Sequence, residues 1–492
     1  MLALHAAAFL LAVVAGSWLK PSLLPRHVYL CWRYPIKDQT GSRSLPTCPY
    51  SWPNGQGDVD KFFKGIENSQ FWGSEHGHVY RIWSGMKGEV VLTKPKHVQA
   101  VFNDSDKHFK GLNNNSGYLM GQLLGQCVGL ISGQDWQATR AVTQMPFVHS
   151  NVPQQVPLVR RHVESYMKML ETDGNLSAGL IHPAEDLKFL PFWIIAEVFY
   201  GKLPPHLVEW LKRLIPLREE LFNKYIIRGG LSRFSFMRFF PTQAGKKLAD
   251  FKKQWRSFNQ SAYQHFRLSN PLTPIVRMYE AANQGAISHE QLLQTVDEAL
   301  FANLDVTIGG LSWNLVFLAA NPVSQERLRV EALSQTTDTV DEYVQSSTTY
   351  LAACILESSR LKPLAAFSVP QSAPTDRLVD EYVIPANTNF IVDAYALNVR
   401  NEFWGARTAS YEPERFLKNK GTQLRYNYWR FGFGPRQCMG KYVADLVIRV
   451  VLDYLVKNYH LGIREKDEQW NRSAESWITH PNMLLQCQRV TA

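Results

Sequence analysis

A ten-residue stretch near the C-terminal end, from Phe431 to Gly440, constrains this chain more than any other feature of its sequence. It reads F-G-F-G-P-R-Q-C-M-G and places a cysteine, Cys438, in a glycine-rich turn. Apolar residues recur at helical spacing directly after it, which predicts a helix with one buried face. Cys438 therefore stands just before a helix N-terminus, where backbone N–H groups and the helix dipole favour a thiolate over a thiol.

The neighbours of this cysteine indicate a flat ligand that carries negative charge. Gly434 and Gly440 allow the backbone to approach a bulky group closely. Arg436 carries a permanent charge with forked donors, which suits a carboxylate. A thiolate, a close backbone approach and a carboxylate partner together describe one face of a haem bound through cysteine.

These residues resemble the haem signature of the cytochrome P450 family, F-x-x-G-x-R-x-C-x-G. Phe431, Gly434, Arg436, Cys438 and Gly440 match its five fixed positions. The resemblance implies haem b (iron protoporphyrin IX) bound through the Cys438 thiolate. It also implies a cytochrome P450 fold, mainly α with small β-sheets, over about residues 50 to 490. A buried structural cysteine is the alternative for a lone thiol, but five matches within ten residues disfavour it.

An apolar run at the start of the chain predicts a membrane anchor. Residues 2–19 read LALHAAAFLLAVVAGSWL, which reaches the roughly 17–25 residues that a spanning helix needs. Lys20 and Arg26 follow the run and no basic residue precedes it, so the body is expected in the cytosol. A cleaved signal peptide is the alternative, although its basic first region is missing.

The domain organisation follows from this anchor. We expect a transmembrane signal anchor at residues 1–19, a proline-containing hinge and linker at 20–49, and a haem-thiolate monooxygenase domain at 50–492. In the family, such an anchor with a proline-containing hinge is typical of single-pass proteins of the endoplasmic reticulum membrane. Five N-x-S/T sequons are then chance matches, at Asn103, Asn114, Asn175, Asn259 and Asn471.

The distribution of charge indicates which partners this chain could bind, and the spacing of its cysteines indicates their role. The net charge of +10 is spread along the sequence, which fits an acidic redox partner or an anionic membrane surface. No arginine-rich arm indicates a nucleic acid, and none is expected as a partner. The six cysteines form no C-x-x-C pair, so the five besides Cys438 are interpreted as reduced thiols that mostly serve packing.

A second motif lies at Trp136 and Arg140, which share a helix face at i and i+4. Alone, this pair describes an amphipathic surface helix with one tryptophan. It also matches the W-x-x-x-R element of the family, whose tryptophan and arginine contact the haem propionates. The resemblance therefore implies that Trp136 and Arg140 bind the cofactor.

One long central helix is predicted from Ser288 to Ala320. Ser288 and Gln291 form a capping box, and Asn321-Pro322 ends the helix. The helix is apolar on every side beyond Glu298, which predicts burial in the centre of the protein. Asp305 is the only charged residue between Ala299 and Ala320. A carboxylate in such a place is usually paired or functional.

The residues around Asp305 resemble the family element A-G-x-D-T-T, whose acid and alcohol relay protons. Asn303 replaces the glycine and Val306 replaces the first threonine, whereas Asp305 and Thr307 keep an acid and an alcohol. Thr307 is rotated by about 100° from Val306 on a helix, so it does not simply fill the same place. Asn303 or a water could take over the relay, or the reaction could need less proton delivery. The alternative is that Asp305 is a salt-bridged structural charge.

Three further charged residues match family elements. Glu357 and Arg360 face together at i, i+3 in an E-x-x-R element, and Arg415 follows in P-E-R-F. By itself the first pair would be a surface ion pair. The resemblance implies a structural charge network of Glu357, Arg360 and Arg415 that supports the cysteine loop.

The remaining elements are expected as follows. Residues 79–93 predict a β-hairpin, 103–134 a long ordered loop, 153–285 several helices interrupted by prolines, and 382–392 a second hairpin. By resemblance, 187–245 covers the substrate cavity, and 364–369 and 477–479 line the pocket beside the haem.

Together these features predict a haem-thiolate monooxygenase. It would use dioxygen, with electrons from NADPH through NADPH–cytochrome P450 reductase, to oxidise a small hydrophobic substrate. The run Leu300-Phe-Ala-Asn-Leu-Asp-Val-Thr307 is most similar to fungal biosynthetic members, some of which act on cyclic dipeptides (diketopiperazines). Alternatives are desaturation or coupling, an isomerase or dehydratase that Val306 favours and Asp305 disfavours, and a haem-based sensor or carrier.

Overall fold

The structure is a computed structural model that describes residues 25–52, 54–111, 117–228, 230–419, 421–473 and 476–490 of the chain. The predicted anchor at residues 2–19 and the sequon at Asn114 lie outside the described residues. Within the described residues, helices predominate and the strands are short, so the expected class, mainly α with small sheets, is confirmed.

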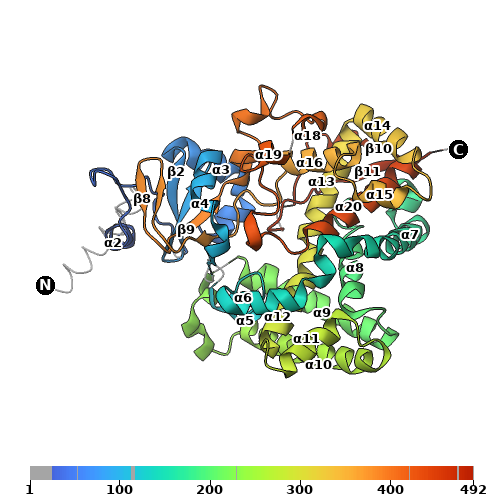
Figure 1. Cartoon of the computed structure of the whole chain (residues 1–492), viewed down its shortest axis with the longest axis horizontal. Coiled ribbons are helices and arrows are strands. Elements are labelled where there is room, and N and C mark those ends of the chain that lie inside the picture. Colours follow the sequence, from blue (N-terminus) through green and yellow to red (C-terminus); the bar gives the residue numbers. More distant parts are fainter. Residues whose placement is uncertain are drawn as a thin grey trace.

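Helices of four or more residues carry most of the described chain (Figure 1). The α-helices are α2 (Pro25–Arg33), α3 (Gly65–His76), α4 (Pro95–Phe102), α5 (Gly117–Leu124), α6 (Gly133–Thr143), α7 (Val156–Asp173), α8 (Phe189–Tyr200), α9 (Pro205–Glu220), α10 (Gln243–Ser269), α11 (Pro274–Asn283), α12 (His289–Phe301), α13 (Val306–Ala320), α14 (Pro322–Leu333), α15 (Val340–Gln345), α16 (Tyr350–Leu361), α17 (Ala394–Asn398), α18 (Glu414–Lys418), α19 (Gly421–Leu424) and α20 (Lys441–Asn458).

Short turns of π- or 3₁₀-helix join these helices. They are η2 (Val59–Phe63), η3 (Ser105–Lys107), η4 (Met145–Phe147), η5 (His149–Gln155), η6 (Asn175–Ala178), η7 (Leu221–Ile226), η8 (Gly230–Arg233), η9 (Ser235–Phe239), η10 (Ala302–Leu304), η11 (Glu402–Trp404), η12 (Gly434–Arg436) and η13 (Glu465–Asp467).

The strands form one five-stranded sheet and two three-stranded sheets. The first has the order β2-β3-β9-β6-β4, and the others are β1-β8-β7 and β10-β11-β5. Their bounds are β1 (Lys37–Asp38), β2 (Val79–Ser84), β3 (Lys87–Leu92), β4 (Phe109–Lys110), β5 (Leu180–Ile181), β6 (Gln371–Ser372), β7 (Arg377–Val379), β8 (Tyr382–Ile384), β9 (Asn389–Val392), β10 (Tyr459–Ile463) and β11 (Leu485–Arg489). The predicted hairpin at 79–93 is confirmed, because β2 and β3 pair antiparallel.

Two other local predictions are wrong. Residues 382–392 form two strands but no hairpin: β8 pairs with β7, whereas β9 runs parallel to β3. β9 is nearly all buried and completes the larger sheet, so its burial decides its partner. The segment 103–134, predicted as a long ordered loop, includes helical structure among its described residues. It contains α5, which buries Leu119, Leu123 and Leu124, a set too short to give a clear period in the sequence.

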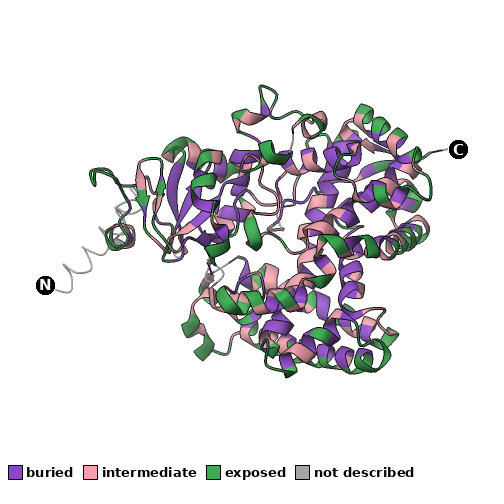
Figure 2. Ribbon diagram, in the orientation of Figure 1, coloured by how far each residue is buried: buried purple, intermediate pink, exposed green. Residues whose placement is uncertain are grey.

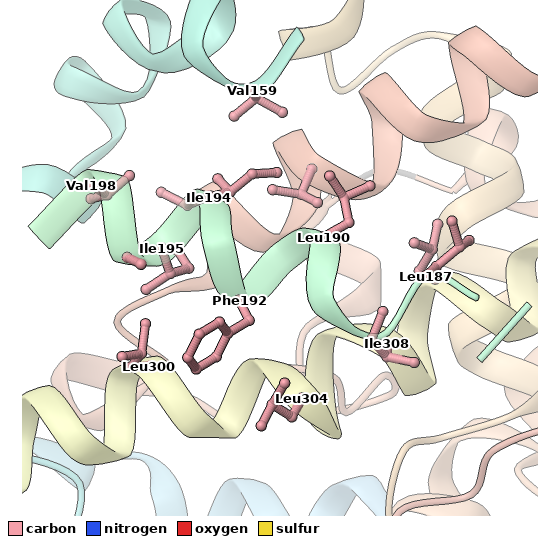
Figure 3. Close-up of a cluster of buried hydrophobic side chains, with 14 of the residues drawn as sticks. Val159, Leu187, Leu190, Phe192, Ile194, Ile195, Val198, Leu300, Leu304 and Ile308 are labelled. Carbon is pink, nitrogen blue, oxygen red and sulfur yellow. The ribbon is translucent and has the colours of Figure 1, made fainter. Parts of the chain in front are cut away.

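The core forms around the central helix. Buried side chains dominate α8 and α13 (Figure 2). Figure 3 shows Phe192 of α8 pointing toward Leu300 and Leu304 on the central helix. Within the described residues, His289–Ala320 is long and apolar enough to cross a membrane, but 72% of its apolar window is buried inside the protein. It is therefore the core helix that its sequence predicts.

The central helix is interrupted, which corrects the prediction of one continuous helix from Ser288 to Ala320. The Ser288–Gln291 capping box is present, and α12 then ends at Phe301. A 3₁₀ turn, η10, follows before α13 begins at Val306. Asn303 lies in this turn, and its side-chain Nδ2 donates to the Ala299 carbonyl oxygen at 2.6 Å.

Candidate functional site

Cys438 lies three residues before α20, in the loop that the sequence predicts. Its backbone N–H donates to the Phe431 carbonyl oxygen at 2.9 Å, which closes the loop. Gly434 has φ of +66°, and a Cβ there would lie 2.1 Å from Ser105 Oγ. A side chain at this position is therefore excluded by backbone conformation and by a neighbour. Gly440 differs, because a Cβ there would meet no atom within 4 Å.

The Cys438 side chain is accessible, as a metal ligand requires, although protein surrounds it closely. Burial raises the pKa of its thiol, while the Gly440 backbone N–H, Arg140 and Lys110 act to lower the pKa. The net direction is opposite to the one expected from the helix N-terminus alone. A metal ion bound to this sulfur would supply the missing stabilisation, since a coordinated thiol is deprotonated outright.

A cluster of three cations lies within electrostatic range of the cysteine. Arg436 is buried, donates from Nη2 to the Ile131 carbonyl oxygen at 2.7 Å, and places its guanidinium 4.5 Å from the Trp136 ring centre. Arg140 stands one turn after Trp136 on α6, and its Nε donates to Gln144 at 3.2 Å. Lys110, at the end of β4, is the third cation.

Burial and mutual repulsion destabilise the charged forms of these three side chains and so lower their pKa values. Burial, with Arg140 nearby, lowers the pKa of Arg436 to about 10. Burial, with Arg436 nearby, lowers the pKa of Lys110 to about 8. Burial also lowers the pKa of Arg140. None of the three forms an ion pair with a described residue.

Glu298, on α12, is the carboxylate nearest to this cluster. It accepts from the Gly129 N–H at 3.0 Å, and burial raises the pKa of its side chain. Three cations and one carboxylate leave about two positive charges in excess at neutral pH. Haem b carries two propionate carboxylates, so the cluster fits this group in sign and in amount. The accessible Cys438 sulfur fits the same group, and so does the open space beside Gly440, where a Cβ would meet no atom within 4 Å.

Asp305 stands in the break of the central helix, where the structure gives it two neighbours from the C-terminal segment. Trp477 Nε1 donates to Asp305 Oδ2 at 3.2 Å, and His480 Nε2 lies 2.7 Å from the Asp305 carbonyl oxygen. Among the described residues Asp305 forms no salt bridge, so the salt-bridged alternative finds no partner there. Lys188 lies within electrostatic range of Asp305. The pKa of Lys188 is raised mainly by its hydrogen-bonded partner Glu219, and Asp305 adds to this effect.

Thr307 points its hydroxyl back along the helix. Its Oγ1 donates to Asn303 Oδ1 at 2.7 Å, and Asn303 in turn donates to the backbone of Ala299. The proton of the Thr307 hydroxyl is thus engaged by the residue that replaces the family glycine. Val306, at the place of the first threonine, offers no donor.

The two expected pocket segments pack against the helix one turn after Asp305. Thr479 N donates to the Leu364 carbonyl oxygen at 3.2 Å, which joins the segments to each other. A Cβ on Gly309 would lie 2.6 Å from Ile478 and 3.1 Å from Leu364. Gly309 therefore permits the close approach of both segments to α13.

Glu357, Arg360 and Arg415 come together below the cysteine loop. Glu357 accepts from Arg360 at 2.7 and 2.8 Å, and Arg415 Nε lies 3.5 Å from the same carboxylate. Arg360 also donates to the Asn398 carbonyl oxygen at 2.9 Å. The Asn398 side chain accepts from and donates to the backbone of Trp429, both at 2.8 Å. The charges are thereby connected to the segment two residues before Phe431.

Sequence reasoning missed three residues of this site: Lys110, Glu298 and Trp477 as a partner of Asp305. Lys110 lies far from the motifs in the chain, and Glu298 lies four residues before the Ala302–Thr307 element but far from Cys438, so only the fold brings both near the cysteine. One signal was available, because Glu298 is the last charged residue before the apolar part of the central helix.

Comparisons with known proteins agree with this geometry. The family model described as Cytochrome P450 matches residues 66–487. The chain is 57% identical to cytochrome P450 monooxygenase aclC of Aspergillus oryzae over 466 residues, which cover 94% of this chain and 95% of that protein. It is 49% identical to cytochrome P450 monooxygenase asaD of Aspergillus flavus, with 94% and 90% covered. Identity to cytochrome P450 monooxygenase gliC of Aspergillus fumigatus is 40%, with 93% and 92% covered.

Proposed function

The chain belongs to the cytochrome P450 family and is a monooxygenase, and from this premise we propose a substrate class, site roles and a membrane location for it. The cofactor is haem b, which supplies dioxygen activation when bound, with electrons from NADPH through a reductase. The proposed substrate is a small, hydrophobic cyclic dipeptide. The assignment of the haem site rests on one observation. Three cations lie near Cys438 and leave two positive charges in excess.

We assign the site residues as follows. Cys438 is the metal ligand, and the propionates are bound by Trp136, Arg140 and Arg436. Phe431, Gly434 and Gly440 shape the ligand loop. Glu357, Arg360 and Arg415 support that loop from below through Asn398 and Trp429.

Asp305 is the proposed proton-delivering acid, and Thr307 is proposed to support the relay without passing the proton itself. Trp477 fixes Oδ2 of Asp305, so Oδ1 is the atom that exchanges a proton with water. Thr307 cannot donate forward while its hydroxyl is bound to Asn303. We therefore infer that Thr307 orients Asn303 and that water accepts the proton from Asp305. Ordered delivery of this kind is worth roughly 10²–10⁴ in rate.

The proposed location is the endoplasmic reticulum membrane, with residues 2–19 in the bilayer and the body in the cytosol. Two exposed groups at one end of the described structure support it. Helix α2 exposes aromatic and apolar side chains beside arginines, and so does η9: they are Val28, Tyr29 and Trp32 on α2, and Phe236 and Phe239 on η9, with Arg26, Arg33 and Arg238. Apolar side chains next to basic ones suit an anionic lipid surface.

The test is turnover of a panel of cyclic dipeptides by full-length protein in microsomes with reductase and NADPH. We expect a product that carries one added oxygen atom and needs both NADPH and dioxygen. Loss of two hydrogens with the same requirements would indicate desaturation or coupling. Conversion that needs neither NADPH nor dioxygen would contradict the monooxygenase reaction on these substrates. Absence of any conversion would remove the proposed substrate class.

A further inference from the structure

A buried ion pair joins α9 to the central helix near the proposed reaction site. Arg218 is 5% exposed and Asp297 is 1% exposed. Arg218 Nε donates to Asp297 Oδ1 at 2.8 Å. Burial raises the pKa of Asp297 to about 6, although Arg218 acts to lower it. The pair is therefore costly to bury, and a purely structural role would be served as well by apolar residues of similar volume.

The guanidinium of Arg218 keeps unused donors. Its Nε is taken by Asp297, whereas no described residue accepts a hydrogen bond from Nη1 or Nη2. Neither nitrogen is among the described side-chain atoms that are both fully enclosed and unpartnered, so both retain accessible surface. A buried cationic group of this kind is normally hydrogen-bonded to an acceptor. Because no described residue accepts from Nη1 or Nη2, the acceptor is water or a ligand.

Aromatic rings surround this donor and connect it to Asp305. The guanidinium lies 5.1 Å from the Phe222 ring centre and 5.4 Å from that of Phe301. Phe222 in turn packs on Trp477 at 5.7 Å between ring centres. Trp477 donates to Asp305. Asp297 and Phe301 lie one turn apart on α12, so the ion pair and this ring share one side of that helix.

The charges of Arg218 and Asp297 indicate which kind of ligand this site can bind. Arg218 is already neutralised by Asp297, and Glu298 is the next residue along the chain, so a carboxylate ligand would add an unbalanced negative charge. A neutral acceptor, such as the carbonyl oxygen of an amide, adds none. The aromatic surroundings of Phe222, Phe301 and Trp477 suit a flat ring.

We propose that Arg218, held in place by Asp297, donates a hydrogen bond from its Nη groups to an amide carbonyl oxygen of the substrate, and so selects neutral cyclic amides. This proposal rests on the proposed function, since it concerns the substrate of the same site. Arg218 acts as a specificity-determining residue, and Asp297 as a positioning residue.

The test compares ligand binding in the full-length haem protein, followed by the optical change that ligands cause. N-benzylpyrrolidinone and benzylcyclopentane form the probe pair, because they are similar in size and only the first has an amide carbonyl. Arg218→Met alone would leave Asp297 unpaired, so the main variant is the double substitution Arg218→Met with Asp297→Leu. Arg213→Met is the matched control, because Arg213 is exposed on the same helix.

We expect the wild-type protein to bind the lactam at least about tenfold more tightly than the hydrocarbon, as for a hydrogen bond to a charged group. The double variant should lose this preference and keep its affinity for the hydrocarbon, whereas Arg213→Met should keep both. Equal preference in wild type and double variant, or no preference in wild type, would overturn the proposal. The proposed function is tested by a different measurement, the turnover of cyclic dipeptides. A negative result there can therefore be distinguished from a loss of this binding preference.

Discussion

Replacing Glu357 by glutamine tests whether the charge network supports the cysteine loop. Glu357 and Arg360 are both fully buried, and the carboxylate also accepts from the Glu412 backbone N–H at 2.9 Å. Removing one partner of a buried ion pair costs about 3–5 kcal/mol, because the other charge stays buried. Arg360 keeps backbone acceptors at Asn398 and at Thr408, the latter at 2.7 Å. We therefore expect the lower end of that range, about 3 kcal/mol.

Glu412→Gln is the matched control. Glu412 pairs with Arg415 at 2.9 Å and with Arg407 at 2.8 Å, but its side chain is 24% exposed and Arg407 is largely exposed. The pair with the exposed Arg407 is worth about 0–1 kcal/mol. Arg415 is only 13% exposed, but it keeps the Glu357 carboxylate at 3.5 Å. The control removes a carboxylate from the same network without leaving a buried charge unpaired.

The assay is urea denaturation of both variants, followed by loss of the ferrous–carbon monoxide band of thiolate-bound haem. The urea midpoint of Glu357→Gln should fall clearly at an unchanged slope, while that of Glu412→Gln should stay close to wild type. Equal shifts of the urea midpoint in the two variants would show that the burial of Glu357 does not determine how much stability is lost. A stable Glu357→Gln with an unperturbed band would remove the supporting role.

Four further outcomes are expected. Cys438→Ala should abolish the thiolate-type carbon monoxide band, whereas replacement of any other cysteine should preserve it. Asp305→Asn should slow turnover by at least about tenfold with normal carbon monoxide binding, and wild-type product per NADPH would leave Asp305 a structural charge. Haem affinity, measured by competition with apomyoglobin at equilibrium, should fall as pH rises above about 8, where Lys110 of the haem-free protein loses its proton, and Lys110→Met should remove this step. Deleting residues 2–19 should reduce membrane partitioning without loss of haem, and glycans on Asn103 would instead place the body in the lumen.

The sign of the Lys110 prediction follows from proton linkage. Burial lowers the pKa of Lys110 toward 8, and a bound dianion would raise it again. Binding therefore takes up a proton above pH 8, and affinity falls as pH increases. The effect should vanish in Lys110→Met because methionine does not titrate.

Local spacing explains which parts of the site could be predicted from the sequence. The α20 helix after Cys438 and the contact of Glu357 with Arg360 both follow from residues within one or two turns. The electrostatic interaction of Lys110 with Cys438 does not, because more than three hundred residues separate them in the sequence and no local pattern predicts that they lie near each other. The same holds for Trp477 and Asp305, and for the strand β9, whose partner is chosen by burial.

The break in the central helix shows where the sequence pattern and the structure differ beside the acid. Apolar periodicity through the region predicts an unbroken helix, because the pattern extends over many residues. In the structure a 3₁₀ turn at Ala302–Leu304 interrupts the helix, and there the Asn303 amide donates to the Ala299 carbonyl oxygen and accepts from Thr307. The Asp305 carbonyl oxygen accepts from the Gly309 N–H at 2.8 Å and lies 2.7 Å from His480 Nε2, while the Asp305 carboxylate accepts from Trp477. The position of the acid thus depends on side chains from the C-terminal segment as well as on the helix itself. Val306 has no hydroxyl that could hold the Asp305 carboxylate, and Trp477, which packs on Phe222 at 5.7 Å between ring centres, is the side chain that donates to it.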